Sequence, residues 1–192
     1  MTPCATTREV QQDGRTSPSP DRPRPLAPLK KGFNEILMEA RSADCHVACL
    51  ALEALALKLM RLVGMTYVTT RLRASGTGWA EVDLIFESTR LAFSRWQIQC
   101  RNTRRVTLDD VAKEVGLTRF LKSNVIVVVT TGEIGPGARR YANRIMQDSN
   151  LAIVMLDGGD LAAIDRNPAA IGDVFNREAR NAMKRKVLKA LE

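Results

Sequence analysis

The alternation of apolar and polar positions divides the chain into helices and strands. Apolar residues at helical spacing predict a short helix over 30–41 and a longer one over 46–63. The second is apolar around almost its whole circumference, which is typical of a helix enclosed by other elements. Residues 65–72 then fit a strand, and 79–86 and 93–102 fit a β-hairpin. The first half therefore reads as two helices followed by three strands.

In the second half, helical patterns alternate with buried strands. A capping sequence at 107–110 opens a helix that we expect to end at Gly116, and the β-branched run 124–130 predicts a strand covered on both faces. Pro136 suits the first turn of a helix reaching about residue 148, before a strand over 151–156. We expect a turn at 157–160, a short helix over 160–164, and a basic amphipathic helix or helix pair over 168–191. This order predicts an α/β fold, with a mixed sheet flanked by helices on both faces.

Composition suggests three parts. Residues 1–29 are rich in Pro, Ser, Thr and Arg and carry few apolar residues, so we expect a disordered tail. Residues 30–165 have enough apolar material for one domain with its own core, and 166–192 form a basic helical extension at the C-terminus. Since no apolar run approaches the roughly 20 residues that cross a bilayer, we expect a cytoplasmic protein without membrane contact.

Positive charge is clustered. The net charge is +8, and residues 88–105 hold five arginines and no acid. Residues 166–192 hold seven basic and three acidic residues, a net of +4. Such clusters favour a polyanionic partner, because binding releases condensed counterions. The plainer alternative is a solvated basic face that aids solubility.

The cysteines do not indicate a disulfide framework or a zinc site. Cys4, Cys45, Cys49 and Cys100 are too widely spread, so we expect free thiols. Cys45 and Cys49 share a helical face, but a structural zinc ion needs four ligands and His46 is the sole histidine.

Two carboxylates stand within apolar segments. Asp83 lies inside the first hairpin strand, where a buried charge is costly unless it is paired or holds a cation. Gln99 and Arg101 share a face near the end of the next strand. Antiparallel pairing of the two strands around residues 88–90 would put Asp83 level with Arg95. A bulge or bend would then be needed to bring Asp83, Gln99 and Arg101 to one site. Glu53 is the second carboxylate, and in an otherwise apolar helix it needs a partner. The alternative is that its side chain reaches solvent or pairs with a surface arginine.

These residues, in this order, resemble a known family. The matching segments are Glu53 in the helix, Val82-Asp83-Leu84-Ile85 in one strand and Ile98-Gln99-Cys100-Arg101 in the next. Further likeness comes from 127–132, 138–142 and 155–161. Over about residues 50–164 the chain resembles the Mrr-type (type IV) restriction endonuclease domain of the PD-(D/E)xK nuclease superfamily.

The resemblance implies a metal-dependent endonuclease that hydrolyses phosphodiester bonds of double-stranded DNA, with modified DNA a candidate substrate. Asp83 would bind magnesium or manganese, helped by the main-chain carbonyl of Cys100 and by Glu53. Gln99 would replace a second carboxylate, and the implied catalytic residues are Asp83, Gln99, Arg101 and Glu53. Cuts on both strands make a homodimer plausible on symmetry grounds. Arginines near these strands would contact DNA: Arg90, Arg95, Arg104 and Arg105.

Arg101 departs from the family, which has lysine at this position. A guanidinium does not lose its proton, so Arg101 cannot be a general base and would act as a fixed cation. Lys58 lies about 140° around the helix axis from Glu53, which makes it a poor substitute. Three readings follow: a nuclease with a changed role for the basic residue, a DNA-binding module that has lost cleavage, or a protein-interaction domain with an acidic partner. In the last two, Asp83 would pair with an arginine such as Arg95.

Overall fold

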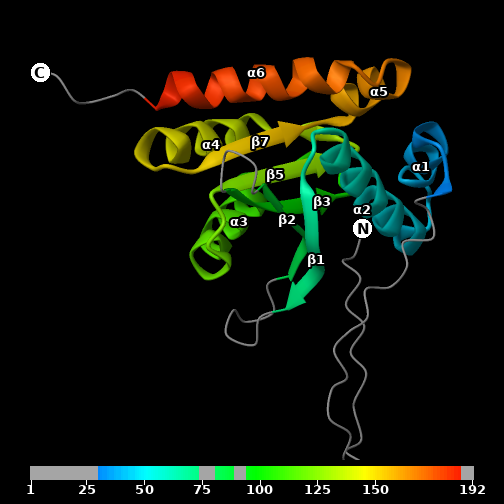
Figure 1. Cartoon of the computed structure of the whole chain (residues 1–192), viewed down its shortest axis with the longest axis horizontal. Coiled ribbons are helices and arrows are strands. Elements are labelled where there is room, and N and C mark those ends of the chain that lie inside the picture. The colour runs from blue at the N-terminus through cyan, green and yellow to red at the C-terminus, as the bar shows by residue number, and fades with distance from the viewer. Residues whose placement is uncertain (1–29, 74–80, 89–93, 187–192) are drawn as a thin grey trace, which may run out of the picture.

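The computed structural model describes residues 30–73, 81–88 and 94–186 (Figure 1). The predicted disordered tail and Arg90 lie outside these residues. The first half follows the predicted order, with α1 (Phe33–Glu39), α2 (Cys45–Leu62), β1 (Thr66–Arg73), β2 (Glu81–Ser88) and β3 (Ser94–Arg101). The second half contains β4 (Arg105–Val106), α3 (Leu108–Leu121), β5 (Val125–Thr130), β6 (Glu133–Ile134), α4 (Pro136–Asp148), β7 (Ala152–Leu156), α5 (Gly158–Arg166) and α6 (Ala170–Arg185).

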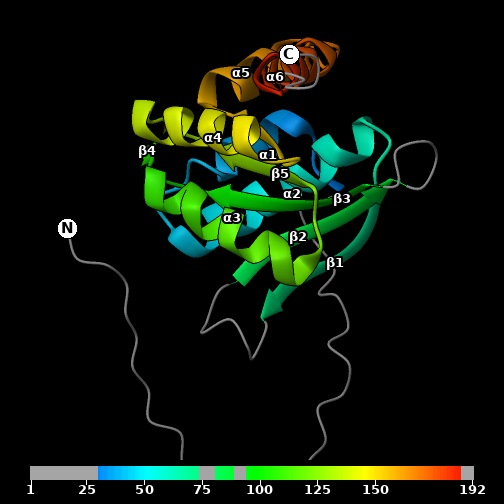
Figure 2. The same ribbon diagram turned by 90° about the vertical axis from the view of Figure 1, so that its left-hand side faces the viewer.

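The main sheet has five strands in the order β1-β2-β3-β5-β7. β1, β2 and β3 pair antiparallel, whereas β3, β5 and β7 run parallel, so the sheet is mixed. β4 and β6 form a separate two-residue parallel ladder beside it. The sheet lies between helices on its two faces, as Figures 1 and 2 show, which confirms the predicted α/β architecture.

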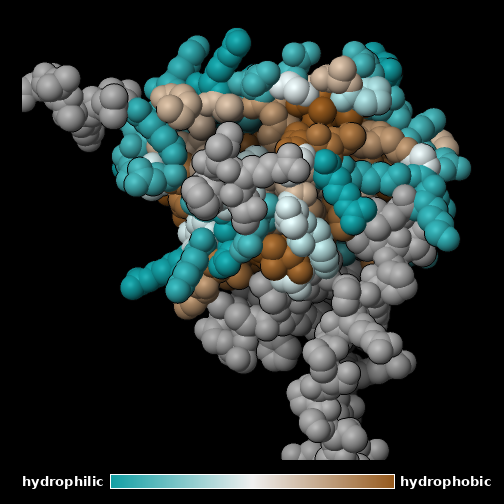
Figure 3. Space-filling model, in the orientation of Figure 1, coloured by the Kyte–Doolittle hydropathy of each residue, from teal (hydrophilic) through white to brown (hydrophobic). Residues whose placement is uncertain are grey.

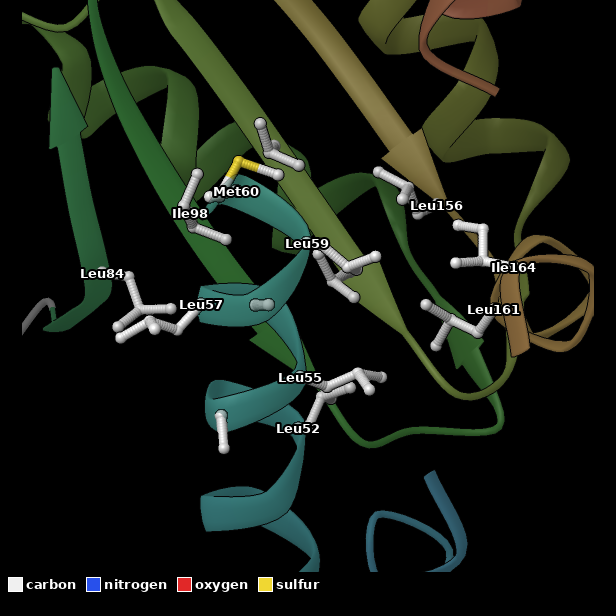
Figure 4. Packing of buried hydrophobic residues seen from close by; sticks show 14 of the residues in the cluster. Leu52, Leu55, Leu57, Leu59, Met60, Leu84, Ile98, Leu156, Leu161 and Ile164 are labelled. Atoms are coloured by element: carbon white, nitrogen blue, oxygen red, sulfur yellow. The ribbon is translucent and has the colours of Figure 1, made fainter. Parts of the chain in front are cut away.

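The first face of the sheet packs against α2. Leu52, Leu55, Leu59 and Met60 are fully buried, because the apolar residues of α2 surround its axis and meet both the sheet and α5. Figure 4 shows these side chains between strand residues and helix residues, among them Leu84, Ile98, Leu156, Leu161 and Ile164. Burying a leucine of this size contributes about 1.5–3 kcal/mol. α2 is therefore anchored firmly against β3.

The second face is covered by α3 and α4 (Figure 2). Ile126 and Val128 of β5 point to these helices, while Val127 and Val129 point to the α2 side. This alternation confirms the prediction that β5 is covered on both faces. Pro136 occupies the first turn of α4, as predicted.

α6 closes the β7 edge of the sheet. Ile171 and Val174 belong to the core on the α2 side, and Ala182 belongs to the core on the α4 side. The basic helix expected as an extension is therefore an integral element of the fold, because its apolar stripe is shared between the two cores. Hydrophilic side chains project from the outer surface around α6, with hydrophobic ones beneath (Figure 3).

Ion pairs fasten α6 to α4 and α5, and we call Arg139, Asp160, Arg177 and Glu178 the α6 cluster. Arg177 donates from Nη1 and Nη2 to both oxygens of Asp160, at 2.8 Å each. Glu178 accepts from Arg139 Nη1 at 2.7 Å and, through its other oxygen, from Arg177 Nε at 3.2 Å. These bonds raise the pKa of Arg177 above its ordinary value. Both buried carboxylates are thus paired through both oxygens.

Two predicted boundaries were wrong. α3 continues past Gly116 to Leu121 and ends at Lys122, which adopts a left-handed φ of 53°. Its buried side chains recur every third residue at 111, 114 and 117, so the packed face carries the helix across the glycine. α5 begins at Gly158 inside the predicted turn, because Asp157 caps it by accepting from the amides of residues 159 and 160.

Candidate active site

The register of the hairpin places Asp83 opposite Gln99. Leu84 pairs with Ile98 and Ser88 with Ser94, so the connection is centred on residue 91. The expectation that Asp83 lies level with Arg95 was therefore wrong. No bulge is needed in the β2–β3 pairing, because this longer connection shifts the partners by four residues.

Asp83 is held by two hydrogen bonds from β3. Its Oδ2 accepts from Gln99 Nε2 at 3.0 Å and from the main-chain N of Cys100 at 2.6 Å. Gln99 is only 5% exposed, and its Oε1 is buried without a hydrogen-bond partner among the described residues. A buried amide oxygen left in this state costs free energy, so it marks a position suited to a ligand.

Glu53 approaches the same part of β3 from α2. Cys100 Sγ lies 3.7 Å from the main-chain oxygen of Leu52, so this turn of α2 packs directly on Cys100. Glu53 is 6% exposed, which contradicts the reading that it reaches solvent. Burial, followed by the charges of Asp83 and Glu53, raises the pKa of the Cys100 thiol well above its ordinary value. The thiol therefore stays protonated and is no nucleophile.

Arg101 is tied to the first turn of α3. Its Nε lies 3.5 Å from Asp110 Oδ1, close enough for an ion pair but without hydrogen-bond geometry. The other oxygen of Asp110 accepts from the N and Oγ1 of Thr107, which completes the predicted capping box. The guanidinium is thereby held on the α3 side of the sheet.

A buried acid on α3 that faces β3 was not predicted from the sequence. Glu114 is fully buried on α3, and its Oε2 accepts from Gln97 Nε2 at 3.1 Å. Gln97 in turn accepts from Ser123 Oγ. Burial raises the pKa of Glu114 from 4.5 to about 7, against the opposing effects of the Gln97 hydrogen bond and the charge of Arg101. The three-residue spacing of positions 111, 114 and 117 was the signal that could have found it.

The arginines expected at DNA are not gathered in one place. Arg95 pairs with Glu87 at 2.7 Å, not with Asp83. Arg101 lies six positions further along β3, a distance of about 20 Å. Arg104 and Arg105 are exposed just beyond β3, and Arg105 pairs with Glu133 at 3.1 Å. Lys58 donates to the main-chain oxygen of Lys31, so it is directed toward α1.

The loops that follow β3, β5 and β7 meet backbone to backbone at this end of the sheet. A Cβ added to Gly132 would lie 2.1 Å from the main-chain oxygen of Thr103, and one added to Gly158 would lie 2.3 Å from that of Thr131. The amide of Gly158 also donates to the oxygen of Gly132 at 2.9 Å. These contacts require glycine and fix the loop that carries Arg104 and Arg105.

The oxygen atoms around Asp83 suit a hard divalent cation. The described residues contain no group of three or more His, Cys, Asp or Glu side chains arranged to hold a metal ion. Asp83 nevertheless accepts from Gln99 Nε2, and the main-chain carbonyl of Cys100 lies 3.5 Å from the same Nε2. Carboxylate, amide and carbonyl oxygens are the ligands that magnesium prefers. The donor set therefore fits a magnesium ion completed by water.

A family comparison agrees with this geometry. The Mrr_cat model, described as a restriction endonuclease, matches residues 48–164, more than half of the chain. The chain belongs to this restriction endonuclease family. The match confirms the resemblance noted from the sequence and spans Glu53, Asp83, Gln99 and Arg101. α1 and α6 lie outside the matched residues of this restriction endonuclease domain.

Solved structures that are similar to this chain include a restriction endonuclease and a protein of unknown function. The MspJI restriction endonuclease, in complex with a 27-mer oligonucleotide, aligns with a TM-score of 0.46 and 23% identity over 91% of this chain and 40% of that chain. The chain thus spans about two fifths of the MspJI chain. AF1548, a protein of unknown function, aligns with a TM-score of 0.43 and 11% identity, over 68% of this chain and 92% of that one. No curated protein matches, and no helix in the described part of the chain is long and apolar enough to span a membrane.

Proposed function

We propose that this restriction endonuclease domain hydrolyses phosphodiester bonds of double-stranded DNA with magnesium or manganese as cofactor. The observation that carries the proposal is the pairing of Asp83 with Gln99 and Cys100, where the Gln99 amide oxygen is buried without a hydrogen-bond partner among the described residues. Asp83 would hold the ion together with the carbonyl of Cys100, with Glu53 acting through water. A bound divalent ion would neutralise charge on the phosphate and activate water.

Each remaining side chain has a separate role in this proposal. Gln99 orients Asp83 through its Nε2. Arg101 remains charged and opposes the negative charge that grows on the phosphate. Because arginine does not accept or release a proton here, the attacking water must lose its proton to another group.

DNA would lie across the exposed loop beyond β3. Arg104 and Arg105 project there at the end of the sheet that carries Asp83. Arg95 is proposed as a more distant contact, about 20 Å from Arg101, and Arg90 is proposed as a contact from its place in the sequence. A homodimer would bring two such sites to the two DNA strands. We also propose that the substrate includes modified DNA and that the protein acts in the cytoplasm.

A DNA-binding module without cleavage is the second candidate. The Arg101–Asp110 ion pair favours it, since a guanidinium committed to α3 is less available to a phosphate. This module would bind DNA in a salt-sensitive way that does not depend on magnesium. If Arg101→Lys cleaves DNA and the wild type does not, the domain keeps the nuclease fold and has lost cleavage because of the arginine at this position.

Supercoiled plasmid provides the test. Purified wild type and Asp83→Ala are incubated with methylated and unmethylated plasmid, with magnesium, with manganese or with chelator. We expect metal-dependent nicking that falls at least ~100-fold in Asp83→Ala. Arg166→Lys, an exposed change on α5, is the matched control and should nick like the wild type. Nicking that survives the loss of the Asp83 carboxylate would refute the proposed active site.

A further inference from the structure

Glu114 is a buried acid that the proposed mechanism does not use. It lies on α3 one turn after Asp110, is fully buried, and faces β3. Gln97 fixes one side of it, because the same Nε2 donates to the main-chain oxygen of Glu114 at 2.9 Å and to Oε2 at 3.1 Å. Glu114 Oε1 makes no hydrogen bond in the described part of the chain. A carboxylate held in this way costs free energy unless a nearby charge compensates it.

Arg101 is the positive charge that the geometry brings to this part of α3. It shares a face of β3 with Gln97, which binds Glu114, and its Nε lies 3.5 Å from Asp110, one helical turn before Glu114. Arg101 Nε is buried without a hydrogen-bond partner among the described residues. Two acids one turn apart on α3 therefore face the strand that carries this guanidinium.

We propose that Glu114 is a positioning residue that, together with Asp110, holds the Arg101 guanidinium beside the Asp83–Gln99 pair. Asp110 contributes one oxygen, because its other oxygen is already bound to Thr107. Glu114 supplies a second, buried charge that a planar guanidinium needs to stay in a fixed orientation. This inference rests on the proposed nuclease function for its consequence, but not for its geometry. The competing explanation is that Glu114 merely joins α3 to β3 through Gln97.

The side-chain Nε–Hε NMR signal of Arg101 tests the geometry without any need for activity. The signal is assigned by its loss in Arg101→Met and is compared at pH 8, above the pKa of about 7 of Glu114. Glu114→Gln keeps an acceptor for Gln97 and removes only the charge, so we expect it to shift the Arg101 signal. Asp110→Asn, a change at a partly exposed position that preserves a capping side chain, should shift it as well.

The matched control is Glu178→Gln, which makes the same change at a buried acid of the α6 cluster. It should leave the Arg101 signal in place. An unchanged signal in Glu114→Gln would overturn the inference, as would an equal shift in Glu178→Gln. If Glu114→Gln does not fold, Glu114→Asp takes its place, because it keeps the charge but withdraws it by one methylene, and an unchanged signal in that variant would overturn the inference as well.

Plasmid nicking then tests the consequence. We expect Glu114→Gln to slow nicking about tenfold, the size of coupling typical of residues in one charged network, and Glu178→Gln to leave it unchanged. An equal loss in the two variants would indicate a general effect of stability and would contradict the role. If the wild type cuts no DNA while the NMR signal still shifts, the proposed nuclease function fails and the positioning of Arg101 by Glu114 stands.

Discussion

Two buried polar clusters in this protein differ in how completely their hydrogen bonds are made. In the α6 cluster, Asp160 and Glu178 each accept through both carboxylate oxygens. Beside Asp83, Gln99 Oε1, Arg101 Nε and Glu114 Oε1 are all buried without a hydrogen-bond partner. These three atoms are the full set of such side-chain atoms in the described residues, and all belong to β3 and α3. We call Gln99, Arg101 and Glu114, together with Asp83 of β2, the β3–α3 cluster.

The difference separates a structural role from a functional one. A buried charge that is fully paired can hold two elements together, and removing one partner leaves the other charge uncompensated. Atoms with unmade hydrogen bonds cost stability unless another molecule completes them. The α6 cluster accordingly fastens a helix that lies outside the matched family residues, whereas the β3–α3 cluster lies within them.

The largest expected effect is a pH dependence of stability that comes from Glu114. Because burial raises the pKa of Glu114 from 4.5 to about 7, the folded protein keeps a proton that the unfolded chain releases near pH 4.5. Between these values the unfolded chain binds fewer protons, so stability falls as pH rises, by about 3 kcal/mol in total from this group. Glu114→Gln should remove this contribution, as chemical unfolding from pH 4 to 8 would show. Identical slopes in wild type and variant would contradict it.

Removing one arginine from each cluster should destabilise the protein to different degrees. Arg177→Met leaves the buried Asp160 carboxylate without its partner, so we expect a loss of about 2–3 kcal/mol in the free energy of unfolding. Arg101→Met should cost less than about 1 kcal/mol, because Glu114, whose pKa is raised to about 7, can keep a proton once the guanidinium is absent. Urea titrations measure both. A larger loss for Arg101→Met would show that the ion pair with Asp110 is structural.

Ser123→Ala should have an intermediate effect. Ser123 donates to Gln97 Oε1, and both side chains are buried, so the variant leaves an acceptor unsatisfied. We expect a loss of about 1–2 kcal/mol in unfolding free energy. Ser149→Ala, which removes a hydroxyl that donates to the main-chain oxygen of Ile145 on α4, is the control for losing a local hydrogen bond. If Ser149→Ala loses as much unfolding free energy as Ser123→Ala, or more, the hydrogen bond to Gln97 stabilises the protein no more than an ordinary local one.

The smallest stability effect is expected at the surface beyond β3. Arg105 and Glu133 form an exposed pair, so Arg105→Gln should change the unfolding free energy by at most about 0.5 kcal/mol. If Arg105 contacts a phosphate, the slope of log affinity for duplex DNA against log salt should fall by about 1. Filter binding at several salt concentrations measures this slope. An unchanged slope would remove Arg105 from the DNA interface.

The sequence was sufficient to predict the elements that carry strong local patterns. The β-branched run of β5, the proline at the start of α4 and the capping box before α3 each encode their structure within a few residues. The family motif likewise placed Asp83 and Gln99 on adjacent strands, and the structure joins them by a hydrogen bond.

Long-range register and packing were not readable in the same way. Alternation along a strand gives the face of Asp83 but does not count the residues in the connection, so its level was assigned to Arg95 rather than Gln99. Gly116 looked like a helix end because tertiary burial of α3 on both sides of it is invisible in local propensity. Glu114 was not predicted because its partner, Gln97, lies on another element. The sequence alone does not show that the two side chains face each other.

The most direct test compares two buried or half-buried aspartates within one set of measurements. Asp83→Ala and Asp160→Ala are each assayed for plasmid nicking with magnesium and for unfolding free energy in urea. The account predicts that Asp83→Ala loses nicking and keeps most of its stability, while Asp160→Ala loses stability and keeps nicking per folded molecule. Nicking that persists in Asp83→Ala, or disappears in folded Asp160→Ala, would contradict the assignment of chemistry to the β3–α3 cluster and of structure to the α6 cluster.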